Sequence, residues 1–132
     1  NKSIQLIRQN PGWRNEFRTN VKALREALTI NGVVFNNNPS HITSVKIGEA
    51  ARCRLVAEEL LDKQGIYLQP INFPTVPKGE ECLRIIVTAK HQLKHINHLA
   101  FSLSKIINGN DPAHRTQFPA FDLAASGSEA AN

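Results

Sequence analysis

The sequence predicts an α+β domain in which a small antiparallel or mixed sheet is covered on one face by helices. Three observations support this prediction. Apolar residues recur every three or four positions over long segments, shorter segments between them alternate in polarity, and glycine stands where the helical spacing stops. Because each helix and each strand then has one apolar side, the two kinds of element are expected to pack as two layers around one core.

The first predicted helix covers residues 13–31. It follows Pro11 and stops before Gly32, because glycine readily adopts the left-handed turn that closes a helix. Its apolar face comprises Phe17, Val21, Leu24 and Leu28. Residues 33–39 are expected to form a short strand or extended piece and then a loop, and residues 41–48 alternate as a strand does.

The second predicted helix covers residues 49–64 and stops at Gly65. Its apolar face comprises Cys53, Val56, Ala57 and Leu60. Residues 66–71 and 82–87 are predicted strands. Pro70 places the first of these strands at a sheet edge, or marks its end, because proline cannot donate to a strand ladder.

The last predicted helix runs from residue 91 to residue 108. Its apolar stripe comprises Leu93, Ile96, Ala100, Leu103 and Ile107. The predicted order is therefore helix, strand, helix, strand, loop, strand, helix. From residue 110 onward the stripe ends and the residues become small and polar, so residues 110–132 are expected to form a flexible tail behind one domain over residues 1–109.

The composition is that of a globular protein, with 41% hydrophobic and 20% charged residues. No apolar run approaches the ~20 residues that a membrane-spanning helix needs, and no basic-then-apolar leader opens the chain. Cys53 and Cys82 lack metal-ligand spacing, so we expect buried thiols in a reducing compartment. A first residue Asn1 and the absence of methionine favour a piece of a longer protein.

The formal net charge of +5 and the pI of 9.6 raise the question of nucleic acid as a partner. The basic residues are spread along the sequence, and the aromatic residues do not interleave with them as in proteins that stack bases. We therefore expect no nucleic-acid partner, since a basic balance also suits an enzyme with anionic substrates. A free-standing basic binding module is kept as an alternative.

Three histidines, His91, His95 and His98, fall at i, i+4 and i+7 of the last predicted helix, which is a spacing that can bind zinc. No cysteine or carboxylate nearby completes a ligand set. A solvated helix face is therefore the favoured interpretation, and we predict no metal site.

The segment INFPTVPKGEECLRI, residues 71–85, combines two features that are unusual in a purely structural segment: two prolines around Thr75 and an arginine inside a predicted strand. Pro74 and Pro77 fix their own φ angles and restrict the residues before them, so Thr75 is held in a narrow range of positions. Such a loop can present a hydroxyl to a ligand at low ordering cost, although loop prolines often only end strands. Arg84 shares a strand face with Ile86, and its guanidinium either points to water or meets a carboxylate or phosphate in bidentate fashion.

Residues 65–79, GIYLQPINFPTVPKG, with Leu83-Arg84 at the expected offset, resemble the C-terminal domain of the 5-aminolevulinate synthases. These enzymes belong to the α-oxoamine synthase group of pyridoxal-phosphate (PLP) enzymes. Residues 39–50, PSHITSVKIGEA, are similar to the Ser-His-Ile segment of the same family, and the likeness covers residues 18–107. Residues 86–88 depart from the proline-rich continuation of this family and look more like its sister enzymes, which leaves the acyl-CoA open.

The resemblance implies the small domain of a fold-type I enzyme that condenses glycine with succinyl-CoA to 5-aminolevulinate, the first step of one route to heme. It assigns two substrate-binding residues. Arg84 corresponds to the arginine that grips the glycine carboxylate, and Thr75 to the threonine whose hydroxyl contacts the succinyl carboxylate. The resemblance further implies a homodimer, located in the cytoplasm of a bacterium or in the mitochondrial matrix of a eukaryote.

The Schiff-base lysine of this family lies in a Gly-rich context in a large domain that would precede this chain, and none of the eight lysines here has that context. We therefore expect PLP to be bound by the missing large domain. We also expect no catalytic or cofactor-binding residue in this chain, and no activity from the chain alone. The alternative within the family is a sister enzyme of the 8-amino-7-oxononanoate synthase or 2-amino-3-ketobutyrate CoA ligase type.

Overall fold

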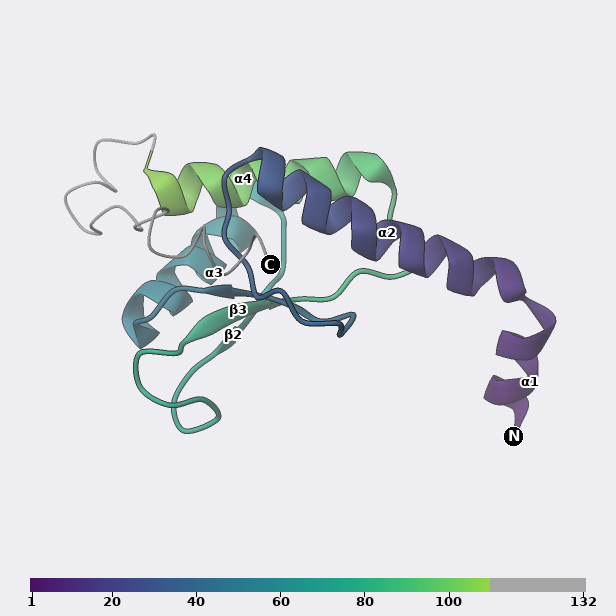
Figure 1. The fold of residues 1–132 in the computed structure, drawn as a ribbon. Helices are drawn as coiled ribbons and strands as arrows, with labels where there is room; N and C mark the ends of the chain where they lie inside the picture. Colours follow the sequence, from purple (N-terminus) through teal and green to yellow (C-terminus); the bar gives the residue numbers. More distant parts are fainter. Residues whose placement is uncertain (110–132) are drawn as a thin grey trace.

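The computed structural model describes residues 1–109, and the elements follow the predicted order with one helix added at the N-terminus (Figure 1). The predicted tail, residues 110–132, lies outside the described residues. The elements are α1 (Lys2–Gln9), α2 (Pro11–Ile30), β1 (Thr43–Lys46), α3 (Ala50–Gln64), β2 (Gln69–Ile71), β3 (Cys82–Ile85) and α4 (Leu93–Asn108).

The strands form one antiparallel sheet in the order β1–β3–β2, so β3 is central. The edge position of β2 confirms the prediction from Pro70. In the register of this sheet, Arg84 of β3 lies between Ser44 of β1 and Gln69 of β2. Since directly opposite residues point to the same side of a sheet, these three side chains share one face.

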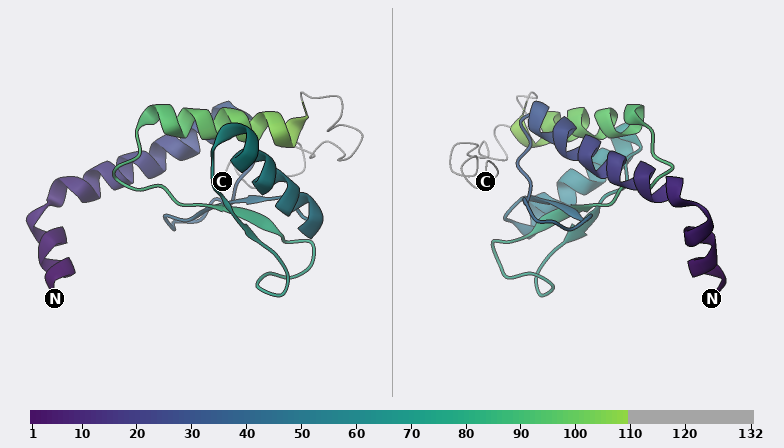
Figure 2. Two further views of the ribbon diagram at one scale, coloured as in Figure 1. Left: turned by 180° about the vertical axis from the view of Figure 1, so that it is seen from behind. Right: turned by 45° about the vertical axis from the view of Figure 1, so that its right-hand side comes forward.

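The two faces of the sheet differ completely in their surroundings. What we call the closed face carries Thr43, Val45, Leu83 and Ile85, which are at most 2% exposed. Three of these side chains belong to one core cluster with apolar residues of α2, α3 and α4, and Figures 1 and 2 show these helices on the same side of the sheet. The opposite, open face carries Ser44, Lys46, Gln69, Ile71, Cys82 and Arg84, and of these side chains only Ile71 is buried. The predicted two-layer α+β fold is confirmed.

The helix predictions hold with small differences. α2 begins at Pro11, earlier than predicted, because proline fits the first turn of a helix, where its missing N–H is not needed. α3 and α4 end at Gly65 and Gly109, whose φ angles of 66° and 68° are left-handed. Leu93 was wrongly placed in the apolar stripe of α4. It is 61% exposed, because the first turn of α4 lies outside the packed layer and burial starts at Ile96.

The strands are shorter than predicted, since ladder pairing covers only the residues that have a partner strand. The segment 33–39 is extended without strand pairing. Its Asn36 nevertheless lies along the outer edge of β1, where its N–H donates to the Ser44 carbonyl at 2.9 Å and its Oδ1 accepts from the Ser44 N–H at 2.7 Å. A side chain thus occupies part of the edge of β1 that faces away from β3.

A buried polar residue connects α2 to the segment that follows β3. Asn20 is 9% exposed, and its Nδ2 donates to the backbone carbonyls of Thr88 and His91, each at 2.8 Å. This contact fixes the path of the chain between β3 and α4. This contact was not predicted from the sequence.

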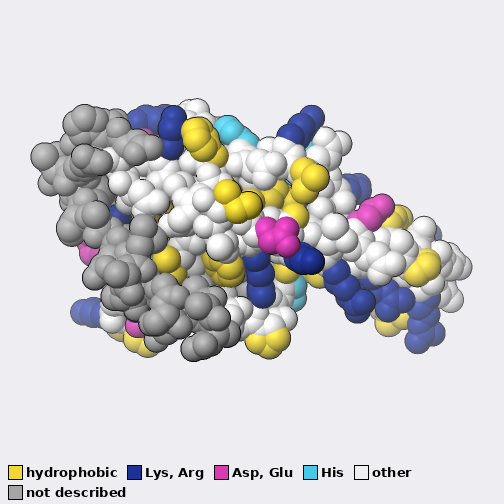
Figure 3. Space-filling view, turned by 45° about the horizontal axis from the view of Figure 1, so that its top comes forward, with side chains coloured by type: hydrophobic (Ala, Val, Ile, Leu, Met, Phe, Trp, Pro, Cys, Tyr) yellow, Lys and Arg dark blue, Asp and Glu magenta, His cyan; other side chains and the backbone are white. Residues whose placement is uncertain are grey.

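α1 and the first half of α2 extend from the body of the domain as an arm (Figures 1 and 2). α1 was not predicted. It is short and buries none of its residues, and its N-cap Asn1 accepts a hydrogen bond from the Ser3 N–H at 3.2 Å. Basic side chains gather along this arm (Figure 3), although they are spread in the sequence. They are Lys2, Arg8, Arg14, Arg18 and Lys22. No helix within residues 1–109 is long and apolar enough to cross a membrane.

Candidate functional site

The candidate site is centred on Arg84 in the middle of the open face. Its side chain is half-buried and lies in the central strand, with Ser44 and Gln69 on either side. Among the described residues its guanidinium has neither a hydrogen bond nor an ion pair. A guanidinium carries five donors in a planar fork that matches a carboxylate or a phosphate. The site therefore offers a preformed strand position for an anion.

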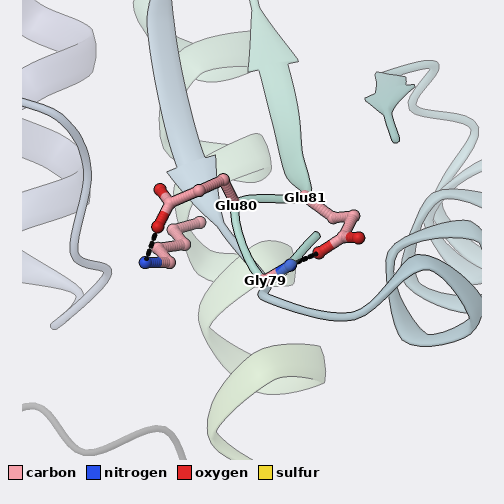
Figure 4. A network of polar contacts seen from close by, with 4 residues as sticks. Gly79, Glu80 and Glu81 are labelled. Carbon is pink, nitrogen blue, oxygen red and sulfur yellow. Dashed lines mark hydrogen bonds and ion pairs between the residues drawn. The ribbon is translucent and has the colours of Figure 1, made fainter. Parts of the chain in front are cut away.

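The acidic residues nearest to Arg84 in sequence are engaged elsewhere (Figure 4). Glu80 pairs with Lys46, with 2.8 Å between Oε1 and Nζ. Glu81 accepts a hydrogen bond from the Gly79 N–H at 2.8 Å. Figure 4 shows the Glu80 and Glu81 side chains pointing to opposite sides of the chain. Neither carboxylate neutralises Arg84, so its charge is available for a ligand.

Cys82 adds a thiol to the same face. Burial raises the pKa of Cys82, while a hydrogen bond with the Ser44 side chain and the positive charge of Arg84 lower it in part. Cys82, Ser44 and Arg84 are therefore close neighbours. The thiol stays protonated near neutral pH, which leaves Arg84 as the charged group of this trio.

Thr75 lies in the loop that connects β2 to β3, and it is exposed. Two contacts within the loop stabilise it. The Thr75 N–H donates to the Asn72 carbonyl at 3.0 Å, and Lys78 Nζ lies 5.3 Å from the centroid of the Phe73 ring, which is a cation–π contact. The Phe73–Pro74 peptide bond is cis. The Thr75 hydroxyl has no hydrogen bond within residues 1–109, and no contact connects Thr75 to Arg84 there. The structure thus places both predicted residues on one hairpin without bringing them into contact.

An apolar groove of about 540 Å³ lies between the end of α3, the end of β3 and the start of α4. Its lining includes Tyr67, Ile86, His91 and His95. Ile86 follows Arg84 on the open face by strand alternation, so the groove begins beside the candidate site. This groove could not be predicted from the sequence, because its walls come from three separated segments.

Each of the three histidines of the zinc-type spacing contacts the backbone, and the His98 Nε2 lies 3.3 Å from the Gln64 carbonyl oxygen. His91 Nδ1 accepts from the Thr88 N–H at 2.8 Å, and His95 Nδ1 accepts from the Gln92 N–H at 3.1 Å. Each imidazole therefore has one ring nitrogen occupied by the backbone. The described residues contain no group of three or more His, Cys, Asp or Glu side chains that could hold a metal ion.

All eight lysines fall within the described residues, and every one of them is exposed. A lysine that holds an aldehyde cofactor covalently needs an enclosed site that lowers its pKa. The lysines of this chain therefore do not fit a covalent PLP site.

A half-buried arginine without a partner among the described residues, on the open face of a helix-backed sheet, suits an anionic ligand. Residues 1–103 match the family model described as aminotransferase class I and II, and the chain belongs to this family.

Its relatives include 5-aminolevulinate synthases. The chain is 41% identical over 104 residues to the 5-aminolevulinate synthase of Rhizobium meliloti (strain 1021), with 79% of this chain and 26% of the relative covered. It is 42% identical over 106 residues to the mitochondrial 5-aminolevulinate synthase of Debaryomyces hansenii, with 80% and 18% covered. The chain thus spans about a quarter or less of the length of these relatives.

Solved structures agree on the fold. A serine palmitoyltransferase from S. paucimobilis, solved with bound PLP, superposes with a TM-score of 0.69 at 23% identity, covering 79% of this chain and 27% of that chain. A Sphingomonas wittichii serine palmitoyltransferase gives a TM-score of 0.63 at 21% identity, over 70% and 24%. This likeness confirms the α+β fold of fold-type I PLP enzymes.

Proposed function

We propose that residues 1–109 are the small C-terminal domain of a PLP-dependent acyltransferase of the 5-aminolevulinate synthase type. The full-length protein would condense glycine with succinyl-CoA to give 5-aminolevulinate for heme synthesis. The single observation that carries this proposal is Arg84, a half-buried guanidinium without a described partner, in a chain whose relatives bear this name. The share of those relatives that the chain covers accords with one domain of a longer enzyme.

In this proposal Arg84 binds the glycine carboxylate through two parallel N–H donors. A bidentate pair fixes both the position and the rotation of a small amino acid, which presents its α-carbon in one orientation. Half-burial strengthens the pair, because fewer waters compete for the guanidinium. Ser44 and Gln69 border the same position and restrict the space around the carboxylate.

Thr75 would contact the carboxylate of the succinyl group from its loop. A hydroxyl donates one hydrogen bond and carries no charge, so it can distinguish a carboxylate-ended acyl chain from an apolar one without binding it too tightly. The internal turns of the loop reduce the freedom that must be lost when the acyl donor binds.

In this proposal PLP is held by the large domain and not by this chain, and the exposed lysines support that division. When bound there, PLP would supply the electron sink that stabilises the glycine carbanion. The role of this chain is to bind and orient the two carboxylates. The enzyme would act as a homodimer. Bacterial and mitochondrial names among the relatives support a bacterial cytoplasm or a mitochondrial matrix as its compartment.

Two alternatives are specific enough to test. A sister synthase of the same family would use another acyl donor, and the exposed Ile86 beside Arg84 and the groove it lines favour an apolar acyl group. A free-standing basic module would use the arm, whose five cations lie beside two carboxylates, Glu16 and the Glu26 that pairs with Lys22 at 3.8 Å. Nucleic-acid affinity that falls steeply with salt would favour the module.

Substitution of Arg84 in the full-length enzyme tests the proposal. Arg84→Leu removes two charge-assisted hydrogen bonds and should raise the glycine KM about 100-fold, with a much smaller effect on the KM for succinyl-CoA. Arg84→Lys keeps the charge but loses the fork, and should give an intermediate glycine KM. Thr75→Val is the matched control, expected to raise the KM for succinyl-CoA and not that for glycine. An unchanged glycine KM in a folded Arg84→Leu enzyme would contradict the assignment.

A further inference from the structure

Glu81 connects two segments that the sequence keeps far apart. Its backbone carbonyl accepts from the Ile47 N–H at 2.8 Å and from the Gly48 N–H at 2.9 Å, just after β1. Its carboxylate Oε2 accepts from the Gly79 N–H at 2.8 Å, in the loop that carries Thr75 (Figure 4). One residue therefore holds the end of the loop against the end of β1.

The Glu81 contact is buried, whereas its neighbour is not. Glu81 is 4% exposed, and the side chains of the Lys46–Glu80 ion pair are 52% and 56% exposed. An exposed ion pair contributes little to a fixed geometry, because water and salt screen it. A buried carboxylate needs its hydrogen bond, since leaving it without a partner is costly. Of the two glutamates, Glu81 is the one that determines the position of the loop.

Two glycines at this junction adopt left-handed backbone conformations. Gly48 and Gly79 have φ angles of 85° and 91°, which non-glycine residues rarely adopt. A side-chain carbon built on Gly48 would lie 3.6 Å from the Gly79 carbonyl oxygen, so the two chain segments run in direct contact. Apart from the bonds to the Glu81 carbonyl, the backbone hydrogen bonds of the loop, from Thr75 to Asn72 and from Glu80 to Pro77, are internal to it, and the Lys46–Glu80 pair to β1 is exposed.

From these contacts we infer that Glu81 is a positioning residue for the acyl donor, acting through the Gly79 N–H on the loop that presents Thr75. This inference rests on the proposed function for its substrate, but the contact itself can be tested without any substrate. Arg84 lies on β3, within the sheet, so the amino-acid carboxylate site should not depend on the Glu81 carboxylate.

The contact is tested first in the 132-residue chain by amide hydrogen exchange followed by NMR. Glu81→Met removes the acceptor at similar volume and should make the Gly79 amide exchange about tenfold faster, as expected for loss of one charge-assisted hydrogen bond. Glu81→Gln keeps an acceptor oxygen and should retain most of the protection. Glu80→Gln, which removes only the exposed ion pair, is the matched control and should leave Gly79 unchanged. Equal Gly79 exchange in wild type and Glu81→Met would overturn the inference.

The consequence is tested in the full-length enzyme. Glu81→Met should raise the KM for the acyl donor about tenfold while the KM for glycine and kcat stay near wild type, and Glu81→Gln should restore the acyl-donor KM. A merely structural role would alter both KM values together, and that result would refute the inference. If Glu81→Met does not fold, Glu81→Asp, which withdraws the carboxylate by one methylene, replaces it in both experiments with the same expectations. Failure of the proposed function appears separately, as an Arg84→Leu enzyme with unchanged glycine KM.

Discussion

The four residues of β3 point alternately to the closed and to the open face of the sheet, and the two faces differ in their surroundings. Leu83 and Ile85 are at most 1% exposed and lie in the core cluster, whereas Cys82 and Arg84 are half-buried on the side without helices. Packing within this chain accounts for both of these closed-face side chains. The open face presents a cation for which the described residues offer no partner. Stability should therefore depend on one face, and ligand binding on the other.

Substitutions of the adjacent residues Leu83 and Arg84 should differ most in their effect on the free energy of unfolding. Leu83→Ala should lower the free energy of unfolding by about 2–5 kcal/mol, because it leaves a cavity in a core that has no room to collapse. Arg84→Ala should change it by less than about 0.5 kcal/mol, because no hydrogen bond or ion pair within the described residues is lost. Urea denaturation of the 132-residue chain measures both values. A comparable loss for the two variants would show that Arg84 is a structural residue and remove the basis of the proposed site.

A smaller but still large effect is expected where the end of β3 is held by a polar contact. Asn20→Asp replaces the amide donor with a carboxylate that faces the Thr88 and His91 carbonyl oxygens, and should destabilise the domain by about 2–4 kcal/mol. Asn15→Asp on the exposed side of the same helix is the matched control and should have almost no effect. The measurement is again urea denaturation. If the two aspartate variants were equally stable, the contact from α2 to the segment after β3 would not be important for folding.

The closed face could be predicted from sequence because packing leaves a periodic signal. Leu24 and Leu28 of α2 and Leu83 and Ile85 of β3 lie at the spacings of a helix and a strand, and all are buried. The ends of α3 and α4 could also be predicted, because the left-handed conformation that ends a helix favours glycine. Leu93 shows the limit of this signal, since periodicity does not say where along a helix the packed layer begins.

The polar contacts could not be predicted, because they join residues far apart in sequence through single atoms. Asn20 and His91 are separated by 71 positions in the sequence. Glu81 is one of two adjacent glutamates that cannot be distinguished in the sequence, although the fold buries Glu81 and exposes Glu80. For Arg84, the sequence left open whether the guanidinium points to water or to an anion, and the structure gives a half-buried side chain. Its assignment to a glycine carboxylate, and that of Thr75 to a succinyl group, depend on the family resemblance and remain predictions.

The thiols of Cys53 and Cys82 allow the two faces to be compared through the pH dependence of the free energy of unfolding. This comparison has the smallest expected effect. Burial, helped by the nearby Cys82 and Glu81, raises the pKa of Cys53 to about 11, although a backbone hydrogen bond from Ile71 opposes the shift. The unfolded chain would lose the Cys53 proton near pH 8.5. Below that pH the contribution of this thiol to stability is complete, and it is lost as the pH rises toward 11.

Wild type should therefore lose roughly 2–3 kcal/mol more unfolding free energy than Cys53→Ala between pH 8 and pH 11, because only wild type must keep a buried thiol protonated. Cys82→Ala is the open-face counterpart, and its curve should stay closer to that of wild type because the Cys82 thiol is only half-buried. Urea denaturation at a series of pH values gives all three curves, and the other titrating groups cancel in the differences. Parallel curves for wild type and Cys53→Ala would mean that water reaches Cys53 in the folded state, and the closed side of the sheet would then be less tightly packed than its zero exposure indicates.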